Sequence, residues 1–113
     1  MNAQLVGWKI VIGMYGWVWV GQVEQIGDEL VVHDAQCVRR WGTRHGLAEI
    51  ACNGPTAETV LDAPSTLRVH RLAVVGLYDV SPYAVERLQA ALNSAQETLW
   101  RERGADTTEK PAE

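Results

Sequence analysis

The chain has 113 residues, of which 47% are hydrophobic and 21% are charged. This length and composition suit one hydrophobic core, which excludes two independent domains and a disordered protein. The formal net charge of −4 excludes a surface built throughout to hold nucleic acid, although a local basic patch stays open. We expect one β-rich domain over residues 1–103.

The first third of the chain predicts strands, because apolar residues alternate there with others and β-branched and aromatic residues are frequent. Turn chemistry separates these runs at residues 13–16, at Ile26-Gly27-Asp28 and at Asp34-Ala35. Such short connections predict an antiparallel sheet in meander order. The expected strands cover residues 8–12, 17–25, 29–33 and 36–41.

The hydrophobic period changes after Gly42, which predicts a short helix. Residues at helical spacing are Leu47, Ile50 and Ala51. Asn53-Gly54-Pro55 then acts as a helix stop. A loop over residues 55–65 is expected next, followed by a second β segment over residues 67–80 that Gly76 breaks or bulges.

A longer helix is expected to begin at Ser81-Pro82, with Ser81 as the N-cap, and to run over residues 82–103. It carries a narrow apolar stripe of the heptad kind at Val85, Leu88, Leu92, Ala95 and Leu99. The stripe docks either on the protein's own sheet or on another subunit. Residues 104–113 are polar and predict a disordered tail.

Arginines cluster around the predicted end of the fourth strand. The candidate ligand-binding residues are Arg39, Arg40, Trp41, Arg44 and His45, and a second basic segment holds Arg68, His70 and Arg71. Guanidinium groups bond phosphate or carboxylate oxygens in pairs, and an indole offers a stacking face for a base. The alternative is a solvated strand surface in which these arginines pair with Glu24, Glu29 or Glu49.

The nucleophiles and metal ligands of the chain show no motif. Zinc accepts cysteine and histidine, but the spacing of His33, Cys37, His45, Cys52 and His70 fits no short metal motif. We therefore read both cysteines as reduced thiols and small core residues, and expect no metal, no cofactor and no catalysis. An enzyme built around Cys37 stays open as a third hypothesis and would need a thiol of depressed pKa.

The chain has five tryptophans and no phenylalanine, and four of the tryptophans fall on expected strands. We do not expect one sheet face to bury all of them. Either the sheet curls into a small barrel around them, or some form an exposed patch that pairs with another subunit. We therefore expect a homo-oligomer.

The middle of the chain resembles a family of small bacteriophage and prophage proteins of unknown function. The residues that carry the resemblance are Asp34-Ala35 through Val38, Trp41-Gly42, Leu47, Ile50-Ala51 and Gly54. The likeness covers residues 8–80 and leaves out the C-terminal helix, and Arg39 and Arg40 stand where aromatic residues are common in the family. It implies a phage origin and a non-enzymatic accessory role, and it transfers no functional residue.

A second resemblance is to Sm-like and SH3-like small barrels, in which a bent hairpin such as residues 17–32 is the central unit. The fold we expect is α+β: a small antiparallel sheet or partly closed barrel, a short helix and a longer amphipathic C-terminal helix. Fold analogy by itself assigns no function.

Two functions follow as hypotheses. The first is a phage-encoded, non-enzymatic, oligomeric module that binds an anionic, nucleotide-like ligand, nucleic acid or a host protein. The second is a structural or assembly protein of the phage particle. Met1-Asn2-Ala3-Gln4-Leu5 lacks the basic start and apolar stretch of a signal peptide, and no apolar run is as long as a membrane span, so a cytoplasmic location is expected.

Overall fold

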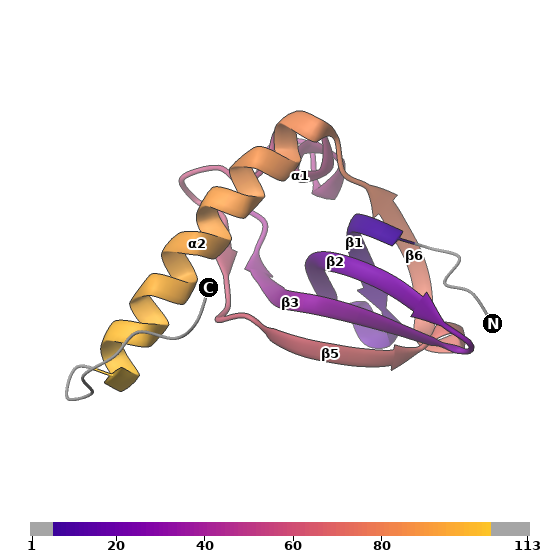
Figure 1. Cartoon of the computed structure of the whole chain (residues 1–113). Coiled ribbons are helices and arrows are strands. Elements are labelled where there is room, and N and C mark those ends of the chain that lie inside the picture. The colour runs from indigo at the N-terminus through magenta and orange to yellow at the C-terminus, as the bar shows by residue number, and fades with distance from the viewer. Residues whose placement is uncertain (1–5, 105–113) are drawn as a thin grey trace.

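The structure is a computed structural model that describes residues 6–104, and it confirms the α+β fold class (Figure 1). The strands are β1 (Val6–Gly13), β2 (Val18–Ile26), β3 (Glu29–Arg40), β4 (Val60–Leu61), β5 (Ser65–His70) and β6 (Val74–Asp79). The helices are α1 (Leu47–Asn53) and α2 (Pro82–Gly104), and two 3₁₀ turns are η1 (Met14–Gly16) and η2 (Arg71–Ala73). The expected tail from Ala105 onward lies outside the described residues.

The six strands form one antiparallel sheet, in which five follow the order β4-β3-β2-β1-β6 and β5 also pairs with β3. β3 pairs with β2 along one edge, and its other edge is shared by β5 near the start and by β4 near the end. In Figure 1, β5 and β6 diverge from η2 and lead to different sides of the sheet. No pairing joins β5 to β6 among residues 6–104, so the sheet curls without closing.

The expected turn at Asp34-Ala35 is wrong, because these residues form a bulge inside the single strand β3. Both stand opposite Gly21 of β2, and Asp34 has a positive φ of 54°. A side chain at position 21 would place Cβ 2.8 Å from the carbonyl oxygen of His33, so only glycine fits there. A bulge inserts one extra residue and bends the strand without ending it.

The second β segment is interrupted at η2, and the expected break or bulge at Gly76 is found as a register shift next to it. Gly76 pairs with Ile12 of β1, whereas the next residue of β1, Gly13, pairs with Val74, so Val75 is left as the extra residue. At η2, the backbone N–H of Leu72 donates to Nδ1 of His70 at 3.1 Å, which satisfies one amide of the tight turn. The loop expected over residues 55–65 also contains the short strand β4.

The protein has two clusters of buried apolar side chains, which lie on opposite faces of the sheet. One cluster packs under the helices and consists of Ile10, Val18, Val20, Val38, Leu47, Ile50, Ala51 and Leu88. The other is lined by strands alone and consists of Val11, Val23, Leu30, Val32 and Ala35. The curl of the sheet encloses this second cluster, which explains how strands without a covering helix bury a core.

Helix α2 begins as the sequence predicted. The hydroxyl of Ser81 accepts from the backbone N–H of Ala84 at 3.1 Å and donates to the carbonyl of Cys52 at 2.6 Å, which joins the helix start to the end of α1. The docked part of the stripe includes Leu88 and Leu92, which are buried, whereas Leu99 is half-buried. In Figure 1, the later part of α2 extends away from the sheet.

The described tryptophans do not share one surface. Trp8 packs against the core under the helices, and Trp19 packs against the strand-lined core. Trp17 is exposed and stacks on Trp19 with ring centroids 6.2 Å apart, and Trp41 lies on a loop elsewhere. The structure therefore divides the tryptophans between core and surface. Among residues 6–104, no helix has the length and apolarity needed to cross a membrane.

Candidate functional site

The loop between β3 and α1 carries three of the five predicted ligand-binding residues. We call residues 41–46 the Trp41 loop. The indole of Trp41 is 43% exposed, and the side chains of Arg44 and His45 are exposed. Gly46 lies next to the indole, since a Cβ built there would stand 3.8 Å from Cζ3 of the ring. These three side chains therefore belong to one surface loop.

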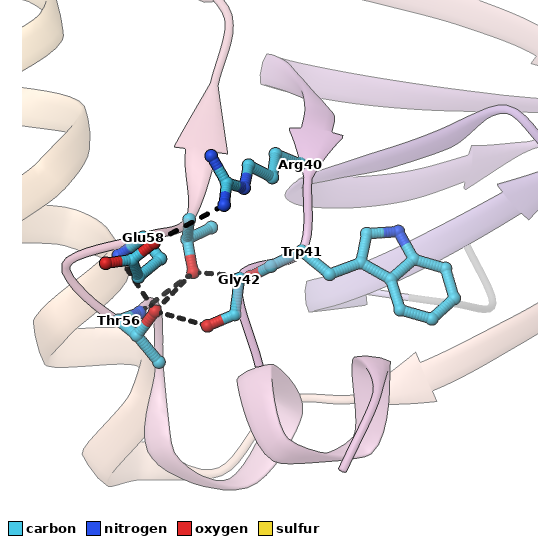
Figure 2. A network of polar contacts seen from close by, with 6 residues as sticks. Arg40, Trp41, Gly42, Thr56 and Glu58 are labelled. Carbon is cyan, nitrogen blue, oxygen red and sulfur yellow. Dashed lines mark hydrogen bonds and ion pairs between the residues drawn. The ribbon is translucent and has the colours of Figure 1, made fainter. Parts of the chain in front are cut away.

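Two threonines hold the start of this loop. The Thr59 hydroxyl donates to the carbonyl of Trp41, and the Thr56 hydroxyl donates to the carbonyl of Gly42, both at 2.7 Å (Figure 2). The approach is close, because a Cβ at Gly42 would lie 2.3 Å from the backbone carbonyl carbon of Glu58. The two segments are thus in backbone contact, and Gly42 has a positive φ of 66° that glycine adopts without strain.

A carboxylate holds the other end of the loop. Oε1 of Glu49 accepts from the backbone N–H groups of Arg44 at 3.2 Å and His45 at 3.0 Å. The Thr43 hydroxyl donates to the carbonyl of Gly46 at 3.0 Å. Glu49 stands in the first turn of α1, where the helix dipole favours a negative charge. The loop therefore has a defined backbone shape at both ends.

The structure does not bring Arg40 and Trp41 together. Figure 2 shows that Arg40 points toward Glu58, whereas the indole of Trp41 points to the opposite side of the chain. The Arg40–Glu58 pair is 3.4 Å long, and both side chains are about two-thirds exposed. An exposed pair of this length contributes little to stability and breaks at low cost.

Arg39 is engaged with Asp62, the residue after β4. The guanidinium donates to both carboxylate oxygens, from Nε at 2.9 Å and from Nη2 at 2.7 Å, in the fork geometry that arginine favours. These hydrogen bonds, and then the positive charge, lower the pKa of Asp62 below its ordinary value. Arg39 therefore links β3 to the chain after β4, and its Nε and Nη2 groups are already bound to Asp62.

The depressed pKa of Asp62 gives a pH prediction. The folded-state pKa lies below the unfolded one, so the ion pair contributes above the unfolded value, and its contribution is lost as the pH falls through the folded value. Arg39→Ala removes the donor, and we expect the pKa of Asp62 to rise in a carboxyl NMR titration. Arg40→Ala is the matched control and leaves the titration unchanged, because Arg40 pairs with Glu58. An equal rise in both variants would contradict the assignment.

The alternative that the arginines form surface ion pairs is confirmed for Arg68, whereas Arg71 and Glu49 have partners other than those expected. Arg68 pairs with Glu29 at 3.2 Å, as predicted, and Arg71 pairs with Asp28 at 3.0 Å. Glu49 binds backbone amides, as described above. Arg44 takes part in none of the ion pairs found among residues 6–104.

The cysteines are both free, and the expectation that both are core residues is wrong for Cys52, which is exposed at the end of α1. Cys37 is half-buried on β3. Its pKa is raised, first by burial and then by the negative charge of Asp62. Within residues 6–104, no group of three histidine, cysteine, aspartate or glutamate side chains is placed to hold a metal ion.

The sequence did not single out the residues that hold the Trp41 loop. Thr56 and Thr59 lie in a segment that the sequence predicts only as a loop, and their partners are backbone carbonyls that any sequence would supply. The one available signal was the pair of glycines, Gly42 and Gly46, that flank the loop. Comparison of the chain with protein-family models, with curated proteins and with solved structures finds no match.

Proposed function

We propose that this protein is a non-enzymatic, oligomeric binding module that takes an anionic, nucleotide-like ligand on the Trp41 loop, in the cytoplasm. The observation that carries the proposal is the exposed indole of Trp41 on a loop held by Thr56, Thr59 and Glu49. An aromatic ring on a preorganised loop binds with little loss of conformational entropy. The phage origin stays a prediction from the resemblance.

Each of the three side chains has a role in this proposal. The indole of Trp41 stacks on a base or another flat ring, which is a contact every base provides. The guanidinium of Arg44 binds phosphate oxygens, and His45 adds a hydrogen bond. Arg40 reaches the ligand only after it leaves Glu58, and Arg39 stays with Asp62.

The test begins with native mass spectrometry of protein purified gently from cells, which reports bound non-protein mass. Nucleoside mono- and triphosphates are then titrated by calorimetry. We expect Arg44→Ala and Trp41→Ala each to weaken binding about tenfold or more, since each removes a contact worth about 1–3 kcal/mol. Arg68→Ala is the matched control, because it removes another exposed arginine, on β5, that pairs with Glu29. Equal loss in all three variants, or no binding by the wild type, contradicts the proposal.

The second candidate is a structural or assembly protein of a phage particle. It is supported by the large apolar side chains exposed on η1, η2 and β6, which suit a protein–protein contact. Detection of the chain in purified particles, with no bound small molecule in native mass spectra, favours this candidate. Absence from particles counts against it.

The reactivity of the two thiols tests the non-enzymatic part of the proposal. Alkylation needs the thiolate, and burial beside Asp62 raises the pKa of Cys37. We expect iodoacetamide at neutral pH to modify Cys52, which is exposed, well before Cys37, as peptide mass spectrometry would show. Faster modification of Cys37 would instead support an enzyme built around that thiol.

A further inference from the structure

The exposed large apolar side chains of the protein concentrate in two short segments. Among the described residues eleven such side chains are exposed, and seven of them belong to these segments. Residues 14–17 contribute Met14, Tyr15 and Trp17, and residues 72–78 contribute Leu72, Val75, Leu77 and Tyr78. Monomeric proteins seldom expose large contiguous apolar patches without a partner.

The two segments meet in space. Gly13, which precedes η1, pairs with Val74 of β6, and a Cβ at Gly13 would lie 3.7 Å from the carbonyl oxygen of Ala73 in η2. The two turns therefore sit side by side at one end of the sheet. We call the exposed side chains at these turns, Met14, Tyr15, Trp17, Leu72 and Val75, the apolar end. Leu77 and Tyr78 lie further along β6, opposite Val11 and Ile10, and point to opposite faces of the sheet. Tyr15 is 95% exposed and has a positive φ of 65°, so the chain accepts backbone strain to present a ring that contacts almost nothing.

β6 also leaves one edge of the sheet open. It pairs with β1 on one side, and no strand pairs with its other side among residues 6–104. Proteins protect such edges with charged side chains, but β6 has only Asp79 at its end, which pairs with Lys9 of β1, and residues 72–78 contain none. At the opposite edge, which β4 and β5 share, β5 has exposed Arg68 and His70 along its length. The two outer edges of the sheet therefore differ in their readiness to pair.

We propose that β6 and the apolar end form the interface of a two-fold symmetric dimer with a second copy of this chain. The proposal rests on the oligomeric part of the proposed function and names the surface that makes it. An antiparallel strand can pair with its own copy about a two-fold axis, which closes the assembly at two subunits. Two copies of the apolar end would also not repel each other, because residues 10–23 and 72–78 carry no charged side chain.

The same geometry limits the strength of the contact. The pairing of β6 with β1 shifts register at its start, so regular strand geometry covers only residues 76–79. Four residues supply few backbone hydrogen bonds, and the side chains of the apolar end supply most of the buried area. We therefore expect a dimer that forms and dissociates with concentration in the micromolar range.

Sedimentation velocity of the full chain over a range of concentrations tests the proposal. We expect Val75→Lys to weaken dimerisation about tenfold or more, because a lysine on an edge strand opposes pairing. Val75 is 68% exposed, so its replacement spares the core. Val60→Lys is the matched control: it changes a 43% exposed valine of β4, at the opposite end of the strand order, and leaves the dimer intact.

Thr66→Lys on β5 separates this dimer from a head-to-tail assembly. If Thr66→Lys breaks the assembly as Val75→Lys does, β5 of one copy pairs with β6 of the next and the two-fold arrangement is overturned. A wild type that stays monomeric at every concentration, or a dimer broken by Val60→Lys, also overturns it.

Amide hydrogen exchange of the wild type keeps the test valid if Val75→Lys misfolds. We expect protection of amides in residues 74–79 to rise with protein concentration, while protection in β5 stays constant. Constant protection in β6 overturns the proposal. Nucleotide binding at the Trp41 loop is measured separately on the same variants. If Val75→Lys is monomeric and still binds nucleotide, dimerisation and ligand binding are independent, and a failure of one proposal is distinguishable from a failure of the other.

Discussion

Leu88→Ala is expected to lower the free energy of unfolding by about 3 kcal/mol. Leu88 is fully buried and packs with Ile50 of α1 and Ile10 of β1 in the core under the helices. Truncation loses the burial of the side chain and leaves a cavity that the surrounding strands fill only in part. Urea denaturation followed by circular dichroism measures the loss.

Leu99→Ala is the matched control, since it makes the same change later on the same helix. Leu99 is half-buried and lines a shallow hollow with Leu61, Ala63 and Ser94. Truncation there creates no enclosed cavity, so we expect a loss below about 1 kcal/mol. Equal losses for the two leucines would contradict the inference that α2 is anchored through its first half.

Gly42→Ala is expected to destabilise the protein by about 3 kcal/mol and to disturb the Trp41 loop. The change meets two obstacles, a positive φ of 66° and backbone atoms of Glu58 and Thr59 within 2.6 Å of the new Cβ. The backbone of Glu58 and Thr59 cannot move away from the new Cβ without breaking the hydrogen bonds that Thr56 and Thr59 make to the loop. We expect ligand binding at the loop to fall with stability.

Gly27→Ala separates the effect of the positive φ from the effect of the backbone contact. Gly27 has a φ of 60°, close to that of Gly42, but a Cβ there meets nothing within 4 Å. Its replacement therefore costs only the left-handed backbone term of about 1–2 kcal/mol. Amide NMR spectra should show shifts at residues 56–59 for Gly42→Ala and none there for Gly27→Ala. Equal destabilisation by both variants would mean that the backbone contact at Gly42 is unimportant.

The candidate site was predictable in part. Trp41, Arg44 and His45 were expected on the basis of residue type, and the structure places them on one exposed loop. The partners of the arginines were not all predictable, because Arg39 and Asp62 stand 23 residues apart and Arg71 and Asp28 stand 43 apart. Sequence distance carries no information about such contacts until strand pairing is known.

The sequence by itself determined the elements whose signals are local. The alternation of β1 and β2, the turn at Gly27-Asp28, the stop of α1 at Gly54 and the cap of α2 at Ser81 each depend on residues a few positions apart. In these places propensity, hydrophobic period and backbone hydrogen bonding favour the same conformation, so reading one chain segment was sufficient.

Only the tertiary structure decided which segments pair and what their side chains meet. Asp34-Ala35 has turn chemistry, yet it became a bulge because β2 presents Gly21 opposite and the paired strands continue on both sides. The division of the tryptophans, the sharing of one edge of β3 by β4 and β5, and the open edge of β6 likewise depend on contacts between distant segments. Such contacts gain their energy from burial and pairing across the fold, which no local pattern records.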